Sequence, residues 1–185
     1  MKSTILSFFI AVGLFFAGCS DQASINGPTN QDLQPSSNLI GLGTNGLQKA
    51  ITISKTINGD VGGQIDIVGS FGSGLGAIQV NGTLTVPAGA YSGDQTISVN
   101  MNGHYAVVDF GPSPFTFDIP LNFSMEITNV ILSGNISAIH FIYIADDGTT
   151  APVELQGETV ANKEGRTLSV TGAQLPHFSR YGWAK

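Results

Sequence analysis

From Lys49 onwards, apolar and polar residues alternate with a period of two, the pattern of β-strands that have one buried face and one wet face. In the longest run, between positions 115 and 127, an apolar residue occupies every second position. We expect this apolar face in a hydrophobic core. Pro120 lies within the run and cannot donate a backbone hydrogen bond, so we expect an edge, a bulge or a division into two strands there. The apolar residues of the run are Phe115, Phe117, Ile119, Leu121, Phe123, Met125 and Ile127.

Shorter alternating segments, separated by turn-forming residues, occupy most of the remaining chain. Acidic and amide-rich turns at 146–148 and 162–165 predict hairpins, with strands following at 152–155 and 166–171. No stretch has a convincing helical period. About nine to eleven short strands separated by turns predict an all-β domain, an antiparallel two-sheet β-sandwich.

The first 48 residues depart from this pattern. Lys2 is followed by about a dozen mostly apolar residues, a signal-peptide core too short to cross a bilayer as a helix. Ala17 and Gly18 then precede Cys19, the single cysteine of the chain. This arrangement resembles a bacterial lipoprotein signal, in which the cysteine receives a diacylglycerol and becomes the new N-terminus. The resemblance implies that residues 1–18 are removed and that Cys19 is lipidated; the alternative is an ordinary secretion signal with an incidental cysteine.

A lipidated Cys19 implies the membrane as a partner and the bacterial cell envelope as the location. Two or more acyl chains, such as a diacylglycerol with a further palmitate, hold a protein firmly on a membrane, whereas one chain holds it only marginally. Ser20 follows the cysteine, at the position where enterobacterial lipoproteins retained in the inner membrane carry aspartate. By that resemblance the outer membrane is favoured.

Residues 19–48 are expected to form the lipidated cysteine and a flexible linker, and residues 49–185 the β-sandwich domain. The linker is rich in Asn, Gln, Ser and Gly, with Pro28 and Pro35, and has few large side chains to bury. Docking of its apolar residues on the domain remains open. These residues are Leu39, Ile40, Leu42 and Leu47.

The composition excludes several classes of partner. The formal net charge is −6, with 7 Lys and Arg against 13 Asp and Glu. Nucleic acid and anionic lipid head groups are therefore expected to be poor partners, because no basic patch is visible in the sequence. A chain with one lipidated cysteine also has no disulfide, so packing alone must hold the fold.

The sequence carries no established catalytic motif. Neither G-x-S-x-G nor H-E-x-x-H occurs, so neither a nucleophile elbow nor a zincin site is indicated. The three histidines, His104, His140 and His177, lie far apart and lack the spacing of zinc ligands. The glycines between 69 and 76 precede a strand-like segment, which favours a hairpin loop over a phosphate-binding loop.

Acidic residues offer one further metal-binding alternative. Asp146 and Asp147, together with Asp94 or Asp109, present oxygen atoms of the kind that calcium prefers. Acidic turns are more often simply solvated. We therefore expect no metal, no cofactor and no enzymatic activity.

Several fragments, taken in order, resemble one known module. The chain is similar between residues 60 and 181 to the β-sandwich domain shared by zonula occludens proteins, ankyrins and the uncoordinated-type netrin receptors. The resemblance implies a β-sandwich with a binding or structural role, because eukaryotic members bind cytoskeletal or signalling partners or pack on neighbouring domains. The matching fragments are Gly62-Gly63, Val86-Pro87-Ala88-Gly89-Ala90, Phe110-Gly111-Pro112, Phe115, Pro120 and His177-Phe178-Ser179-Arg180-Tyr181.

The last of these fragments contains the one triplet that suggests a reaction. In some relatives of the module, His-Phe-Ser marks self-cleavage between Phe and Ser. Carried over to this chain, the Ser179 hydroxyl would attack the Phe178 carbonyl with assistance from His177. We instead expect a final strand with Phe178 inward and His177 and Ser179 on the opposite face, and an intact peptide bond.

Together these observations predict a non-enzymatic, lipid-anchored binding or assembly module of the cell envelope, with an envelope protein or a glycan as partner. One alternative is the self-processing domain. The other is a carbohydrate-binding surface module, in which exposed aromatic side chains stack on sugar rings. Its candidate aromatics are Tyr91, Tyr105, Tyr143 and Trp183.

Overall fold

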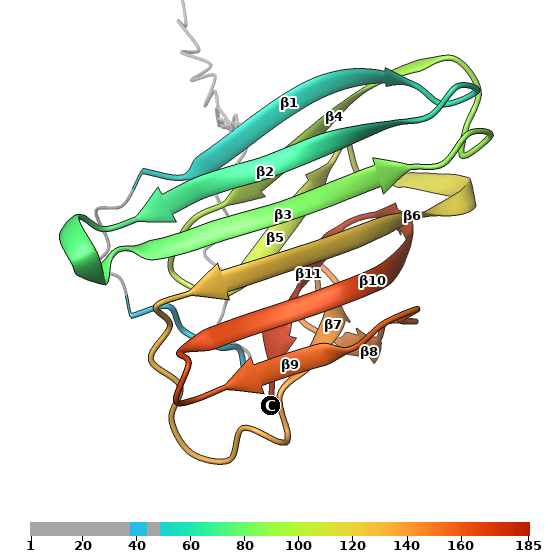
Figure 1. Ribbon diagram of the computed structural model, residues 1–185. Coiled ribbons are helices and arrows are strands. Elements are labelled where there is room, and N and C mark those ends of the chain that lie inside the picture. Colours follow the sequence, from blue (N-terminus) through green and yellow to red (C-terminus); the bar gives the residue numbers. More distant parts are fainter. Residues whose placement is uncertain (1–37, 44–48) are drawn as a thin grey trace, which may run out of the picture. The chain divides into compact units, whose positions relative to one another are not determined.

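The computed structural model describes residues 38–43 and 49–185. All of these residues belong to one compact unit, which spans residues 33–185. Within it, two antiparallel β-sheets pack against each other (Figure 1), which confirms the all-β sandwich expected from the alternation.

One sheet has six strands in the order β1–β4–β5–β11–β7–β8, and every neighbouring pair is antiparallel. Strand β8 is short and forms one edge of this sheet. The bounds are β1 (Ile51–Asn58), β4 (Asp94–Met101), β5 (Val107–Gly111), β7 (His140–Ile144), β8 (Thr150–Pro152) and β11 (Arg180–Ala184).

The other sheet has five strands in the order β2–β3–β6–β10–β9, again all antiparallel. A single 3-10 turn, η1 (Gly74–Gly76), lies in the β2–β3 connection, so the glycine-rich segment is a hairpin loop as expected. The bounds are β2 (Gly63–Phe71), β3 (Ile78–Val86), β6 (Phe115–Thr128), β9 (Thr159–Asn162) and β10 (Thr167–Phe178).

The core lies between the two sheets and is rich in aromatic rings. Phe123 on β6 meets Phe110 and Phe141 of the opposite sheet, at centroid distances of 5.2 and 5.6 Å. Phe141 in turn packs edge-on against Trp183, which is completely buried. These interlocked rings join the sheets without a disulfide, consistent with a fold held by packing.

Strand β6 confirms most of the predicted alternation and corrects one position. Phe117 and every second residue from Leu121 to Ile127 are buried, and Phe115 is half-buried, but Ile119 is 44% exposed. The ladder to β10 shifts register between Leu121 and Thr116, around Pro120. Of the edge, bulge or division expected at Pro120, the structure has a bulge-like irregularity, and Ile119 beside it is turned away from the core.

The predicted hairpin turns are also confirmed. Asp146 and Asp147 lie between β7 and β8, where the Ala145 amide donates to the Thr149 carbonyl at 2.8 Å. In the turn between β9 and β10, the Gly165 amide donates to the Asn162 side chain at 2.8 Å. The strand expected at 152–155 is displaced, because β8 already ends at Pro152. Leu155 makes only a single bridge to β10.

Residues 38–43, within the segment expected to be a linker, pack on the domain. Leu39 forms a bridge to Ala184 and Gly41 a bridge to Tyr105, while Ile40 and Leu42 are buried. The packed part of the chain therefore begins before Lys49, and the docking that the sequence left open occurs for these residues. Leu47 lies outside the described residues.

Strands β10 and β11 follow one another in sequence but belong to different sheets. Strand β10 lies between β6 and β9, and β11 lies between β5 and β7. The last two strands therefore occupy interior positions in both sheets, and the chain crosses between the sheets at Ser179.

Candidate functional site

The His177-Phe178-Ser179 triplet lies at this crossing and not within one terminal strand. Phe178 is buried against Phe115 and Phe117, as expected. Ser179 stands between β10 and β11, and its carbonyl accepts a hydrogen bond from the Phe110 amide at 2.8 Å. The expectation of a single final strand is therefore wrong. The ladder to β6 shifts after Leu175, and the chain then leaves the five-stranded sheet.

The His177 ring packs among tyrosines instead of pointing into water from an outer face. Its ring stands edge-on to Tyr143 at a centroid distance of 5.0 Å and lies 6.1 Å from the Tyr181 ring. Nδ1 is 3.4 Å from the Phe178 carbonyl oxygen and 3.5 Å from the Tyr181 hydroxyl. Within the described residues, no hydrogen bond joins this ring to the Ser179 hydroxyl, the proton that a base would have to remove.

Tyr181 fixes the base of this cluster. Its hydroxyl donates to the His177 carbonyl at 3.0 Å, which ties the start of β11 to the end of β10. Burial raises the pKa of the Tyr181 phenol well above its usual value, and the neighbouring Tyr143 raises it further. The phenol therefore stays protonated and serves as a hydrogen-bond donor.

An edge cleft opens beside this cluster, where the chain passes from β8 to the segment that leads into β9. It consists of two hollows of about 330 and 530 Å³ that share Ala151, Pro152 and Val153. After these three residues, the Glu154 carbonyl accepts a hydrogen bond from the Gln174 amide of β10 at 2.8 Å. This bond fixes the segment between β8 and β9 against β10. The segment therefore divides one open edge of the sandwich into two compartments.

The smaller hollow is mainly apolar, but aromatic rings and polar groups meet in its walls. Tyr143 and His177 line it together with Glu154, Gln174 and Tyr181. Tyr143 and His177 are half-buried, and Glu154 is exposed. Such a wall combines ring surface with donors and acceptors of hydrogen bonds.

The larger hollow is mainly apolar. Phe141, Ile142 and Leu155 line it, with His140 and Thr159 as polar members. Among the described residues, the Thr159 Oγ1 atom, like the Trp183 Nε1 atom of the core, is buried and has no hydrogen-bond partner. A buried hydroxyl without a partner is uncommon in native proteins.

Two of the four aromatics proposed for sugar stacking lie in the core and cannot stack on a ligand. Trp183 and Tyr91 are both buried, and the Tyr91 hydroxyl donates to the Ile57 carbonyl at 3.0 Å. Tyr105 and Tyr143 are half-buried on different strands and connections. The prediction that these four residues form a flat row of exposed rings is therefore wrong, because Tyr91 and Trp183 pack in the core.

The groups proposed for metal binding do not converge. Asp109 pairs with Arg180 at 2.7 Å, and Asp94 accepts from the Asn58 amide group at 2.7 Å. Asp147 accepts from the Thr149 hydroxyl, a bond that lowers the pKa of its carboxyl. In the described part of the chain, no three His, Cys, Asp or Glu side chains gather closely enough to hold a metal ion.

The proposed lipidation site, Cys19, lies outside the described residues. Among residues 38–43 and 49–185 we find no helix with the length and hydrophobicity of a membrane span.

No protein-family model matches the chain, and no curated protein matches it in sequence.

Proposed function

We propose that this protein is a lipid-anchored, non-enzymatic binding module of the bacterial cell envelope, with the outer membrane favoured. The anchor is Cys19 behind its lipoprotein-like signal. The binding site is the edge cleft, and the observation that carries the proposal is its pair of adjoining hollows, which combine apolar surface with the rings and polar groups of Tyr143, His177 and Glu154.

The cleft has the properties of a ligand site. Ligand pockets are typically concave, of about 300–1,000 Å³, mostly apolar, and equipped with a few polar groups. Each of the two hollows falls within this range, at about 330 and 530 Å³. A ligand that spans both would have an apolar part against Phe141 and Leu155 and a polar part near Glu154 and Gln174. Another envelope component with such an amphipathic segment is the partner we propose.

A glycan is the second candidate, for the smaller hollow alone. Sugar rings combine apolar C–H faces with hydroxyl groups, so they need an aromatic wall with hydrogen-bonding neighbours. Tyr143 offers the wall, and Glu154, Gln174 and His177 offer the neighbours. In this binding mode the glycan enters a pocket. It does not need a flat row of exposed aromatic rings, which the burial of Trp183 excludes.

We also propose that the domain is a bacterial counterpart of the zonula occludens, ankyrin and netrin-receptor module. The ordered fragments around Pro87, Pro112 and His177 support this relation. Eukaryotic members of that module act by binding, which agrees with the function proposed for this chain.

Photocrosslinking in intact cells tests the cleft. The photoreactive residue p-benzoylphenylalanine is placed at Ala151, which lines both hollows, and in a control at Val68, which is 70% exposed on β2. We expect irradiation to give a discrete adduct from position 151 alone. Digestion of the adduct by proteases or by glycosidases separates the two candidate partners. Equal adducts from both positions, or none from position 151, would contradict the proposed binding site.

A further inference from the structure

Five connections and strand ends meet at one end of the sandwich, which we call the Leu75 end. The Asn129 side chain after β6 donates to the Ala77 carbonyl in the β2–β3 loop at 2.8 Å. Arg166 in the β9–β10 turn donates to the Asn129 carbonyl at 3.0 Å. Figure 1 shows these parts together, with η1, the tips of β2, β6 and β9, and the start of β1 on the same side.

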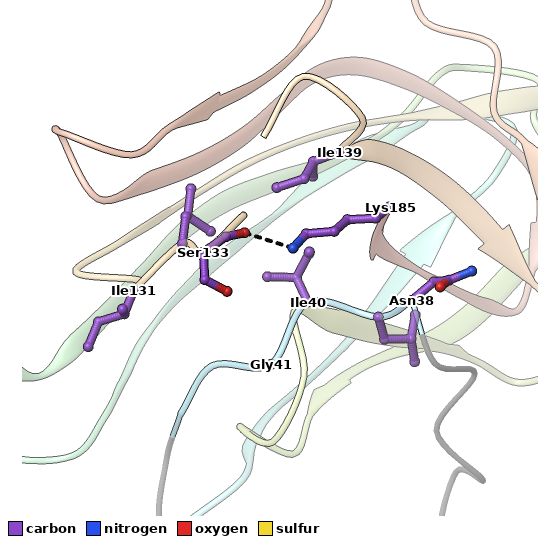
Figure 2. Close-up of a pocket in the computed structure, with 9 residues that line it drawn as sticks. Asn38, Ile40, Gly41, Ile131, Ser133, Ile139 and Lys185 are labelled. Carbon is purple, nitrogen blue, oxygen red and sulfur yellow. Dashed lines mark hydrogen bonds between the residues drawn. The ribbon is translucent and has the colours of Figure 1, made fainter. Parts of the chain in front are cut away.

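The beginning of the described chain and the end of β11 also lie at this end. The Lys185 amide donates to the Asn38 carbonyl at 2.9 Å, and its ammonium group donates to the Ser133 carbonyl at 2.7 Å. Figure 2 shows Lys185 reaching across to Ser133, with Ile40 and Asn38 beside it. Asn38 is 38 − 19 = 19 residues from Cys19 in the sequence, so a chain anchored at Cys19 enters the domain here.

Cations gather at the Leu75 end although the protein is acidic. Six Lys and Arg residues lie within residues 38–43 and 49–185, and four of these are at or next to this end, all exposed and none in an ion pair there. Two acidic residues lie at the same end of the described domain. Glu164 is in the β9–β10 turn, and Glu126 is near the end of β6. The four cations are Lys49, Lys163, Arg166 and Lys185.

The opposite end has the opposite charge. Asp60 accepts a hydrogen bond from the Gly93 amide at 2.9 Å, which joins the β1–β2 and β3–β4 turns. Arg180, the one basic side chain near this end in the described part of the chain, is paired with Asp109. The exposed acids there are Asp60, Asp94, Asp118, Asp146 and Asp147. The sandwich therefore has a positive and a negative end, which the net charge of −6 conceals.

Exposed apolar side chains accompany the cations. Leu75 stands at the tip of the β2–β3 loop between two glycines with a relative exposure of 104%, and Ile131 after β6 is 78% exposed. A single exposed leucine is ordinary on a soluble protein. Apolar tips at the same end as four cations, where a lipid-anchored chain enters, are the composition of a surface that lies on an anionic membrane.

We propose that the Leu75 end docks on an anionic lipid surface, with Leu75 and Ile131 entering the head-group region and the four cations facing lipid phosphates. The proposal rests on the lipid anchor at Cys19 and adds an orientation to it. It also revises the expectation that anionic lipid head groups are poor partners. That expectation followed from the total charge, whereas docking depends on the local charge of one end. The acidic end then faces away from the membrane.

Tryptophan quenching in vesicles tests the orientation. The full chain is purified from the membranes of an expressing bacterium and reconstituted into vesicles of phosphatidylethanolamine, phosphatidylglycerol and brominated lipid. A Leu75→Trp variant reports on the proposed contact, and a Val61→Trp variant is the matched control, because Val61 is 76% exposed in the β1–β2 turn. The native Trp183 is buried and supplies a constant background.

We expect the Trp at position 75, and not the Trp at position 61, to be quenched. Removing one cation by Lys163→Gln should lower the ratio of docked to undocked protein about fivefold at low salt. Lys55→Gln, in the middle of β1, should leave it unchanged. Equal quenching at both positions, or equal quenching in phosphatidylcholine alone, would overturn the docking proposal. A chain that does not float with vesicles would overturn the anchor and the docking together, whereas a floating chain without selective quenching would overturn the docking alone.

Discussion

Replacing Phe123 by alanine tests the packing at the centre of the sandwich. Phe123 is completely buried on β6, opposite Leu84 of β3 and Ala173 of β10. Its ring also meets Phe110 and Phe141 of the other sheet, at 5.2 and 5.6 Å. The substitution therefore leaves a cavity that touches both sheets.

The expected loss of unfolding free energy is about 3–5 kcal/mol, the range for Phe→Ala in a core. Two aromatic pairs are lost, each worth about 0.5–1.5 kcal/mol beyond its buried area, which places the loss in the upper half of that range. Domains of this kind have a total stability of about 5–15 kcal/mol. Phe123→Ala should therefore bring the domain close to unfolding at physiological temperature.

The matched control is Ile119→Ala on the same strand. Ile119 continues the apolar alternation of the sequence but is 44% exposed, so its loss should cost below about 1 kcal/mol. Urea unfolding of residues 33–185, followed by the fluorescence of the buried Trp183, measures both variants. Equal shifts of the two midpoints would refute the register at Pro120, and two small shifts would refute the packing of Phe123.

Three further predictions concern the anchor, the buried phenol and the sheet crossing. Cys19→Ser should leave an unprocessed or soluble precursor, measured by membrane fractionation and mass; a variant that is correctly cleaved and membrane-bound would contradict lipidation. Burial raises the pKa of Tyr181 in the folded state, so its contribution to stability is complete below its unfolded pKa of about 10 and is lost as the pH rises from there towards the folded value. Unfolding measured against pH should therefore show a decline above about pH 10 that is shallower in Tyr181→Phe, and an unchanged slope would contradict this origin. The bond between Phe178 and Ser179 should stay intact, with one mass after days at neutral pH; a shorter species that disappears in Ser179→Ala would demonstrate self-processing.

Most of the strands could be predicted from the sequence, because alternation reports directly on burial in a two-layer fold. The run from Phe115 to Ile127 is correct except at Ile119, and the exception has a local cause at Pro120. Proline indicates that a ladder is interrupted but not which side chains change face after the interruption. The direction of Ile119 therefore depends on pairing with β10, about fifty residues away.

The sites were less predictable because they depend on residues that are distant in sequence. Lys49, Lys163 and Lys185 are scattered along the chain, and only the strand order brings them to one end. The edge cleft likewise joins Tyr143 to His177 across two sheets. The burial of Trp183 could not be predicted from the sequence either, because aromatic residues occur both in protein cores and in sugar-binding surfaces.

The interior positions of β10 and β11 have a consequence for how the protein reaches its destination. Strands β7 and β8 are linked to their sheet only through β11, and β9 only through β10, so neither sheet is complete without the final strands. A chain that is still being synthesised lacks both, and pairings between distant strands form late. Under the proposed lipoprotein signal, the nascent polypeptide should therefore remain unfolded while it is threaded through a narrow secretion channel, and should fold only after its last segment has emerged on the far side. On that proposal, the order of strands would keep the chain competent for export until translocation is complete.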